Sequence, residues 1–369
     1  METVDLKYKI GIGLIPKIGP VLTKRLIAYT GSIEAIFHEK KPLLEKIPGI
    51  GEKLTQYLIN QKVLERAETE IDYISRNNIK ALFYLDKEYP ERLKNCEDAP
   101  VILFVKGEVN LNNRKVISIV GTRNATAYGR ERCNQLVSDL AERKHNPLIV
   151  SGLAYGIDIC AHKASLKNGL ETAAVLGHGL TFLYPAMHRA ISYEIVEQGA
   201  LISDFVSDQK PEPGNFIKRN RIIAGLADAT IVVESGERGG ALITADIANS
   251  YNRDVFAFPG RIGDKYSAGC NKLIKTNKAA LIEGINDLEY IMGWQVHKSK
   301  KATQKQLFVK LSPEEEIIVK NLQENGDLSI DQLCVNCEMP VSRISALLLN
   351  LEFSGIVQCL PGKLYRYTK

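Results

Sequence analysis

Residues 213–225 have the sequence Pro213-Gly214-Asn215-Phe216-Ile217-Lys218-Arg219-Asn220-Arg221-Ile222-Ile223-Ala224-Gly225. The apolar periodicity of the second half predicts a short helix over 216–226, with the preceding Pro and Gly in a loop. The first turn of that helix would carry Lys218, Arg219, Asn220 and Arg221 beside free backbone N–H groups. Cationic side chains and the positive end of a helix dipole both favour a bound anion such as phosphate. The alternative is a solvated helix start whose charges pair with nearby carboxylates.

The sequence on either side of this helix predicts an open α/β sheet. Six apolar runs resemble buried parallel strands, and helical stretches separate most of them, as in repeated βαβ units. The runs are 116–120, 148–150, 172–176, 200–205, 230–234 and 255–258. Five of them are followed by glycine-rich or polar turns, at 121–129, 151–158, 177–179, 235–240 and 259–261. Because such turns meet at the carboxyl edge of a parallel sheet, we expect a Rossmann-like, mostly parallel sheet with a ligand site there.

The composition sets limits on the class of protein. The chain has 369 residues, 45% hydrophobic residues and a formal net charge of +5, which allows two or three domains and permits a nucleic-acid partner without requiring one. Seven scattered cysteines favour a reducing compartment. The N-terminus lacks a signal-peptide pattern, and no run of about 20 apolar residues occurs. We therefore expect a cytoplasmic protein that does not contact a membrane.

The usual cofactor signatures are absent from the turns. The turn at 121–129 has no Gly-x-Gly-x-x-Gly, and the chain has no Gly-x-x-x-x-Gly-Lys-Ser/Thr, so neither a dinucleotide nor a P-loop nucleotide site is expected. Cys334 and Cys337 form the only close cysteine pair, which is a poor zinc site without a second pair. We expect no cofactor and no metal.

The N-terminal part contains an internal repeat. Ile15-Pro16-Lys17-Ile18-Gly19 recurs as Ile47-Pro48-Gly49-Ile50-Gly51, an offset of 47 − 15 = 32 residues. A Pro-x-Ile-Gly turn followed by an apolar-periodic helix resembles the helix-hairpin-helix module, in which the hairpin and the N–H groups of the next helix face a phosphate. The alternative is that both hairpins serve only for packing.

The C-terminal part predicts a separate small domain. Residues 296–310 are lysine-rich and resemble a linker. Helices are predicted at about 313–325, 329–336 and 340–353, followed by strands at 356–360 and 363–367. That order resembles a winged helix, whose third helix would turn Ser342 and Arg343 toward DNA. A role in protein contact is the alternative, because this part is not basic.

Five blocks of sequence follow one another between residues 80 and 290. They are Val120-Gly121-Thr122-Arg123, Ser151-Gly152-Leu153-Ala154-Tyr155-Gly156-Ile157-Asp158, Arg219-Asn220-Arg221-Ile222-Ile223-Ala224-Gly225-Leu226, Gly240-Ala241-Leu242-Ile243-Thr244-Ala245, and Ser267-Ala268-Gly269-Cys270-Asn271. Together they resemble the DprA/Smf family of DNA-processing proteins.

The resemblance implies a fold, a function and partners. It implies an extended Rossmann domain over 71–295 that binds single-stranded DNA and forms a homodimer. A helix-hairpin-helix (SAM-like) domain over 1–70, the linker 296–310 and a winged-helix-like domain over 311–369 complete the organisation. The implied function is a recombination mediator, not an enzyme, which protects incoming DNA and loads the RecA recombinase during natural transformation.

The candidate site combines charge, neutral hydrogen-bonding groups and a ring, as single-strand binding requires. The candidate DNA-binding residues are Gly121, Thr122, Arg123, Asn124, Ser151, Gly152, Phe216, Lys218, Arg219, Asn220, Arg221, Arg238 and Asn271.

Two other classes of function stay open at this point. Arg238-Gly239-Gly240-x-x-x-Thr244 faintly resembles the glycine-threonine loop of lysine-decarboxylase-like nucleoside-monophosphate hydrolases. Asp158 and His162 lie one helical turn apart and could act as acid and base, although a hydrogen bond on the helix surface is the simpler interpretation. A scaffold that binds only protein is the third class.

Overall fold

The computed structural model describes residues 2–294, 311–360 and 364–368. The chain divides into two compact units, Met1–Trp294 and Gln295–Lys369, and each is considered by itself. The expected linker, 296–310, lies outside the described residues.

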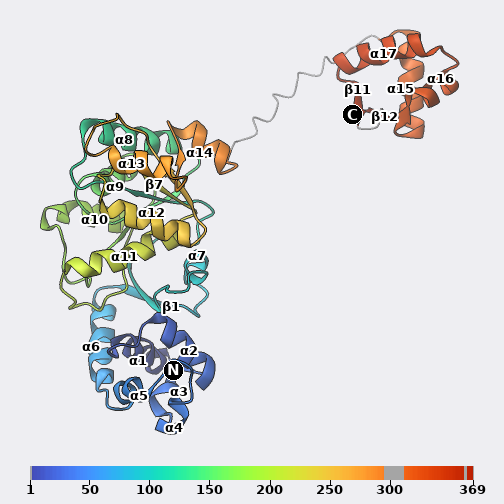
Figure 1. Ribbon diagram of the computed structural model, residues 1–369. Coiled ribbons are helices and arrows are strands. Elements are labelled where there is room, and N and C mark those ends of the chain that lie inside the picture. Colours follow the sequence, from blue (N-terminus) through green and yellow to red (C-terminus); the bar gives the residue numbers. More distant parts are fainter. Residues whose placement is uncertain (1, 295–310, 361–363, 369) are drawn as a thin grey trace. The chain divides into compact units, whose positions relative to one another are not determined.

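A nine-stranded sheet forms the centre of the first unit, in the order β1-β2-β6-β5-β4-β3-β7-β8-β9 (Figure 1). The strands are β1 (Ile79–Phe83), β2 (Ile102–Gly107), β3 (Val116–Val120), β4 (Leu148–Ser151), β5 (Thr172–Val175), β6 (Gly199–Ser203), β7 (Ala229–Val232), β8 (Asp254–Ala257) and β9 (Ala280–Leu281). The six predicted strands form the contiguous block from β6 to β8, and every neighbouring pair in it is parallel. This confirms the predicted mostly parallel sheet. The prediction missed the antiparallel strands β1 and β2 and the two-residue edge strand β9.

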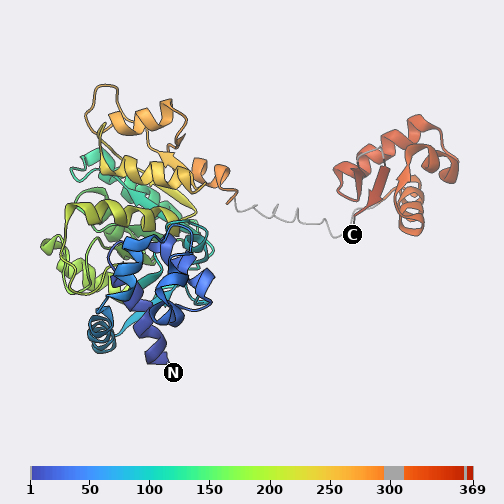
Figure 2. The same ribbon diagram turned by 60° about the horizontal axis from the view of Figure 1, so that its bottom comes forward.

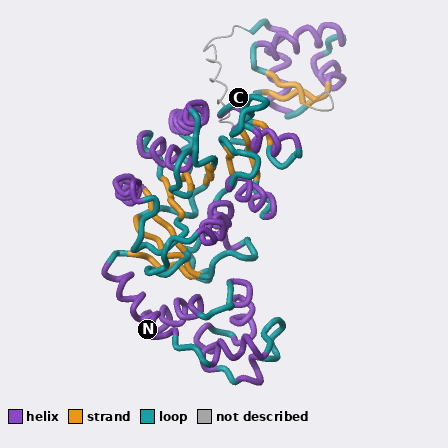
Figure 3. Tube along the Cα trace, turned by 60° about the vertical axis from the view of Figure 1, so that its left-hand side comes forward, coloured by secondary structure: helices purple, strands orange, loops and turns teal. Residues whose placement is uncertain are grey.

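Helices cover both faces of the sheet (Figure 3). Strand β3 shows why: Val116 and Val120 belong to one hydrophobic core, and Ile117 and Ile119 belong to the other. A strand that is apolar on both faces must be covered on both. One face carries α8 (Ala127–Glu142), α9 (Ile157–Lys167), α10 (Arg189–Gln198), preceded by η1 (Ala186–His188), and α14 (Ile285–Ile291). The other carries α7 (Glu91–Lys94), α11 (Pro213–Leu226), α12 (Gly240–Ser250) and α13 (Ala268–Lys275).

The strand order reverses at β3. The chain runs from β3 through β4 and β5 to β6 on one side, then returns to place β7 and β8 on the other side. The connections that leave β3 and β7 therefore diverge to opposite faces. In open parallel sheets this divergence opens a crevice beyond the carboxyl ends of the two strands.

Helices also make up the N-terminal part of the first unit, which Figure 2 shows in blue from its own end. They are α1 (Glu2–Leu14), α2 (Pro20–Thr30), α3 (Ile33–His38), α4 (Lys41–Leu44), α5 (Glu52–Ile59) and α6 (Val63–Arg76). Ile10 of α1 and Ile74 of α6 share a core with Ile102 and Phe104 of β2. The expected boundary at residue 70 falls inside α6, so the helical part and the sheet form one unit.

The internal repeat has matching backbone geometry in its two copies. Lys17 and Gly49 occupy equivalent positions and have φ values of 65° and 84°. A left-handed conformation suits glycine and is unfavourable for lysine, so the first copy is the strained one. Gly19 and Gly51 then precede α2 and α5 with φ values of −89° and −87°.

Helix α6 is also tied to the loop that leads into α11. The buried carboxylate of Glu70 accepts hydrogen bonds from the backbone N–H of Ser207 at 2.8 Å and from its hydroxyl at 2.7 Å. Arg66 bridges Glu70 and Asp208, at 2.9 and 2.8 Å. These contacts connect residues 137 to 142 positions apart in the chain.

The second unit has the predicted winged-helix order. It contains α15 (Pro313–Asn325), β10 (Leu328–Ser329), α16 (Ile330–Cys337), α17 (Val341–Phe353), β11 (Val357–Leu360) and β12 (Leu364–Tyr367), with the sheet order β10-β12-β11. Reciprocal capping boxes start two of the helices, Ser312 with Glu315 and Ser329 with Gln332. The sequence analysis missed only the two-residue strand β10 among these described elements.

Candidate nucleic-acid interface

Helix α11 begins at Pro213, three residues before the predicted start at 216 (216 − 213 = 3). Proline is favoured in the first turn because its missing N–H needs no partner there and its φ is already helical. The prediction that Lys218, Arg219, Asn220 and Arg221 share the first turn with free N–H groups is therefore wrong. These residues lie in the second and third turns.

A cavity of about 490 Å³ lies in the crevice between the ends of β3 and β7. Its lining comes from the turn after β3, the first half of α11 and the beginning of α12. Seven of the thirteen candidate residues line it: Gly121, Thr122, Arg123, Asn124, Phe216, Arg219 and Asn220. The fold thus brings together residues about a hundred positions apart, and the whole lining includes residues of four of the five sequence blocks.

Backbone contacts hold the turn after β3 in place. The N–H of Thr122 donates to the carbonyl of Glu234 at 2.7 Å, and its own carbonyl accepts from Ile157 at 3.1 Å. Gly121 permits this approach, since a Cβ atom there would lie 2.5 Å from Cγ1 of Ile157. The side chains of Arg123 and Asn124 are exposed. Within the described residues, Arg123 has no ion-pair partner, so its charge is available to a ligand.

The beginning of α12 supplies a second positive feature that the sequence analysis did not include among the site residues. Gly239, Gly240, Ala241 and Thr244 line the same cavity. No side chain in the described parts of the chain caps this helix, which is 11 residues long. Its first-turn N–H groups therefore favour an anion. The consecutive glycines before a helical pattern were the available signal.

Phe216 provides a ring on the cavity wall. Its neighbours are Tyr184, with ring centroids 5.6 Å apart, and the guanidinium of Arg219, 5.9 Å from the ring centroid. Tyr184 is 45% exposed and also lines the cavity. The sequence analysis missed Tyr184, because nothing in the local sequence separates it from an ordinary loop tyrosine. The rings of Phe216 and Tyr184 therefore line the same cavity as Arg123.

Arg219 lies beneath this wall and is only 4% exposed. Its Nη1 donates to the carbonyl of Gly152 at 2.8 Å and to the carbonyl of Val175. Burial lowers the pKa of Arg219 to about 10, so it stays charged at neutral pH. Burial also raises the pKa of the Asp158 carboxyl, and the nearby charge of Arg219 opposes that shift. Arg219 therefore joins the ends of β4 and β5 and balances a buried carboxylate.

Two other charged candidates lie away from the cavity. Arg221 forms an ion pair with Asp204 at 2.6 Å, and both side chains are largely buried. The expectation that its guanidinium is free for phosphate is corrected accordingly. Arg238 lines a different cavity, formed by α12 and α13.

The four remaining candidates do not line the cavity either. The buried hydroxyl of Ser151 donates to the carbonyl of Ile119 at 2.6 Å, and Gly152 contributes its carbonyl to Arg219. The side-chain amide of Asn271 bonds the backbone of Gly260 at 3.1 and 2.9 Å. Lys218 is exposed on α11. Ser151, Gly152 and Asn271 are therefore held by hydrogen bonds within the fold, and their role as DNA-binding residues stays a prediction.

Asp158 and His162 are not assembled as an acid–base pair at the cavity. Asp158 lines it, but His162 is fully buried beyond the lining, and its Nδ1 lies 2.7 Å from Oγ1 of Thr172. Burial lowers the pKa of His162 from 6.5 to about 3. The imidazole is therefore neutral throughout the physiological range.

This burial predicts a pH dependence of stability. Between pH 6.5 and about 3 the unfolded chain binds a proton at residue 162 that the folded chain excludes. The contribution of His162 to stability is thus full above pH 6.5 and falls by about 1.4 kcal/mol per pH unit below it. Urea denaturation of the wild type and of His162→Gln at pH 7, 6 and 5 should show a shallower pH slope in the variant. Parallel pH dependences would contradict this role.

Glu234 links the turn after β3 to the start of α8. The side chain of this nearly buried residue accepts from the N–H of Thr126 at 2.9 Å and from its hydroxyl at 2.5 Å. Thr126 is the N-cap residue of α8. In Rossmann folds the first helix N-terminus receives the pyrophosphate of a dinucleotide. Here the Glu234 carboxylate accepts the hydrogen bonds of Thr126 at the N-terminus of α8, the position that a pyrophosphate would occupy.

Within the described parts of the chain, no group of three or more His, Cys, Asp and Glu side chains could hold a metal ion. None of the helices in the described ranges is both long and apolar enough to cross a membrane.

The comparisons with known proteins agree with this arrangement. Residues 80–292 match the family model described as DNA recombination-mediator protein A, and residues 302–363 match the DprA winged helix domain. The chain belongs to the DprA/Smf family. The resemblance inferred from the five blocks is thereby confirmed.

Relatives in this family cover most of the chain. Protein Smf from Synechocystis is 31% identical over 99% of this chain and 100% of its own length. DNA processing protein DprA from Bacillus subtilis is 40% identical over 53% of this chain and 65% of its own. The crystal structure of DprA from Streptococcus pneumoniae has a TM-score of 0.62 at 32% identity, covering 77% of this chain and 95% of that one.

A solved structure from Helicobacter pylori extends the comparison. It is DNA processing protein A, reported for its single-stranded DNA binding mode, and it has a TM-score of 0.53 at 27% identity. It covers 60% of this chain and 98% of that one.

Proposed function

We propose that this chain is a single-stranded DNA-binding recombination mediator that grips the strand in the cavity between β3 and β7. The observation that supports this most directly is the convergence of Arg123, the uncapped start of α12 and the rings of Phe216 and Tyr184 on one crevice. Phosphate fits the first two features and a base fits the rings. The Helicobacter pylori relative is known for binding single-stranded DNA.

The wider biology follows from family membership and belongs to the same proposal. The mediator protects incoming DNA during natural transformation in the cytoplasm, forms a homodimer through the sheet-containing unit, and loads RecA onto the strand. It has no turnover of its own: incubation with AMP should release no free base. RecA loading is tested by the rate of RecA assembly on DNA already coated with a single-strand-binding protein, with and without this chain.

Arg123→Ala tests the strand-binding site itself. Each phosphate contact on a single strand contributes about 0.7 to the slope of log K against log salt. We expect Arg123→Ala to weaken oligothymidine binding and to reduce that slope by about 0.7. The measurement is fluorescence anisotropy of a labelled oligothymidine across a salt series.

Arg114→Ala is the matched control for this experiment. Arg114 is also exposed, but it lies just before β3, at the opposite end of that strand from the cavity. Its removal changes the net charge equally and should leave the slope unchanged. If both variants behave alike, the cavity is not the binding site.

A further inference from the structure

A second cavity in the first unit has a volume of about 730 Å³. It is formed where the start of α8 meets the loop between β8 and α13, residues 258–267. None of the residues Arg123, Phe216 and Arg219 lines it, so it is separate from the proposed strand-binding cavity.

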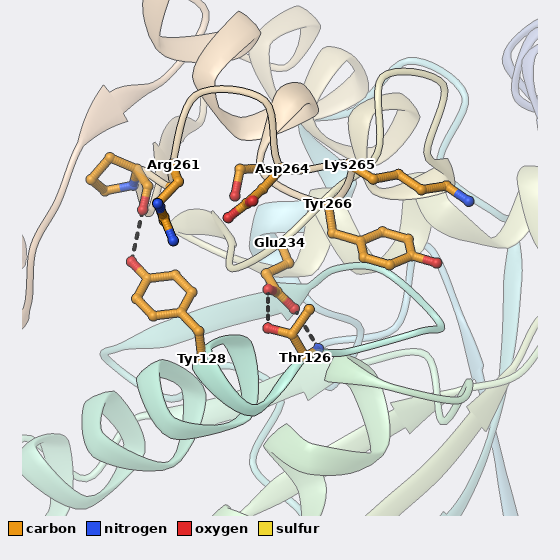
Figure 4. A pocket seen from close by; sticks show the side chains of 10 residues that line it. Thr126, Tyr128, Glu234, Arg261, Asp264, Lys265 and Tyr266 are labelled. Carbon is orange, nitrogen blue, oxygen red and sulfur yellow. Dashed lines mark hydrogen bonds between the residues drawn. The ribbon is translucent and has the colours of Figure 1, made fainter.

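Two tyrosine rings form walls of this second cavity (Figure 4). The hydroxyl of Tyr128 donates to the carbonyl of Pro259 at 2.7 Å, which fixes the ring although the residue is 41% exposed. Tyr266 comes from the loop, and its backbone carbonyl accepts from the N–H of Ser235 at 2.8 Å. The Tyr128 ring, held in this way, offers a stacking surface at low entropic cost.

The charged side chains of this cavity are arranged in two groups. Glu234 already accepts two hydrogen bonds from Thr126, so it is satisfied internally. Asp264 and Arg261 line the same space, and within the described residues neither side chain has an ion pair or a side-chain hydrogen bond. Lys265 also lines it, but its ammonium lies over the Tyr266 ring, 5.4 Å from the centroid. One carboxylate and one guanidinium thus remain available to a ligand.

We propose that this cavity binds a purine nucleotide, either free or as one nucleotide of a single strand. The base stacks on the ring of Tyr128 or of Tyr266, and a purine offers the larger face for stacking. The Asp264 carboxylate accepts the N–H donors of the base edge, as acidic side chains do in pockets that read an extruded base. The Arg261 guanidinium holds the phosphate. The start of α8 is not used, because Glu234 occupies its capping residue.

Fluorescence of 2-aminopurine tests the site, since stacking on tyrosine quenches it. One arm uses the free 5′-monophosphate of 2-aminopurine riboside. The other uses a short single strand with one internal 2-aminopurine. Tyr266→Ala and Arg261→Ala should each weaken the quenching. For Tyr266→Ala, the apparent affinity of the protein for the probe should fall by roughly 5- to 150-fold, the loss typical of one stacked base. Ile262→Ala is the control, because Ile262 belongs to the same loop, is 100% exposed and does not line the cavity.

The two arms identify the source of the nucleotide. Quenching of the free monophosphate that Tyr266→Ala and Arg261→Ala both weaken assigns the site to a free nucleotide. Quenching confined to the strand and lost in the same variants assigns it to a nucleotide of bound DNA. No quenching in either arm, or variants equal to Ile262→Ala, would overturn the proposal. Arg123→Ala reports on the first cavity independently, so failure of the strand-binding function is distinguishable from failure here.

Discussion

Replacing Arg219 by methionine should lower the free energy of unfolding by about 3–5 kcal/mol, the order of loss when a buried charge is left uncompensated. Methionine keeps an unbranched apolar stem but leaves the carbonyls of Gly152 and Val175 without a donor. It also removes the positive charge near Asp158 that opposes the rise of the Asp158 pKa caused by burial. Urea denaturation followed by circular dichroism measures the change.

Lys218→Met is the matched control for this prediction. It makes the same kind of substitution one residue earlier in α11, where the side chain is exposed, so the urea midpoint should hardly change. The double variant Arg219→Met, Asp158→Asn should recover part of the loss, because it removes the uncompensated charge. An unchanged urea midpoint for Arg219→Met alone would show that the hydrogen bonds of Arg219 to the ends of β4 and β5 do not stabilise the fold.

Replacing Phe216 by alanine should weaken oligothymidine binding by about 1–3 kcal/mol, the loss typical of one stacked base. Stacking does not release counterions, so the salt slope should stay that of the wild type. A weaker affinity with an unchanged salt slope distinguishes the stacking role of Phe216 from the phosphate contact of Arg123, because loss of Arg123 reduces the slope. Anisotropy titrations at two salt concentrations distinguish the two effects.

Tyr290→Ala serves as the aromatic control for Phe216. Tyr290 lies on α14, is 75% exposed and does not line the proposed site. Phe216→Tyr keeps a ring and should keep most of the affinity. Wild-type affinity in Phe216→Ala would remove this ring from the strand-binding surface.

The central sheet was predictable because its signal is local. A parallel strand buried on both faces must be apolar along its length, and the runs around Ile117, Ile149 and Ile231 show this directly. β1 and β2 were missed although β2 has six residues and begins with four buried apolar ones, because the prediction looked for βαβ units and these two strands pair antiparallel across the four-residue helix α7. The start of α11 was missed because Pro213 and Gly214 are typical of loops, although proline is equally at home in a first helical turn.

The site residues whose role depends on backbone geometry could be predicted from the sequence. The residues whose role depends on which side chain or carbonyl they contact could not. The glycine-rich turn at Gly121 follows from its position after a parallel strand. By contrast, the state of Arg221 depends on Asp204, which lies on a different element and is 17 residues away. Arg219 likewise finds its acceptors 67 and 44 residues away. A cationic sequence therefore does not reveal which guanidinium groups remain unpaired after folding.

The hydrogen bonds from Ser207 to Glu70 give the N-terminal helices a mechanical role. The loop that ends at the first turn of α11 is anchored on α6, and α6 in turn shares its apolar side with β2. A shortened chain starting after Arg76 would lose the hydrogen bonds between Glu70 and Ser207. It would also expose the apolar side chains of β2 that α1 and α6 cover. The N-terminal helices therefore act as a support for the sheet. A displacement of α6 would also move the loop before α11, which leads to the proposed strand-binding cavity.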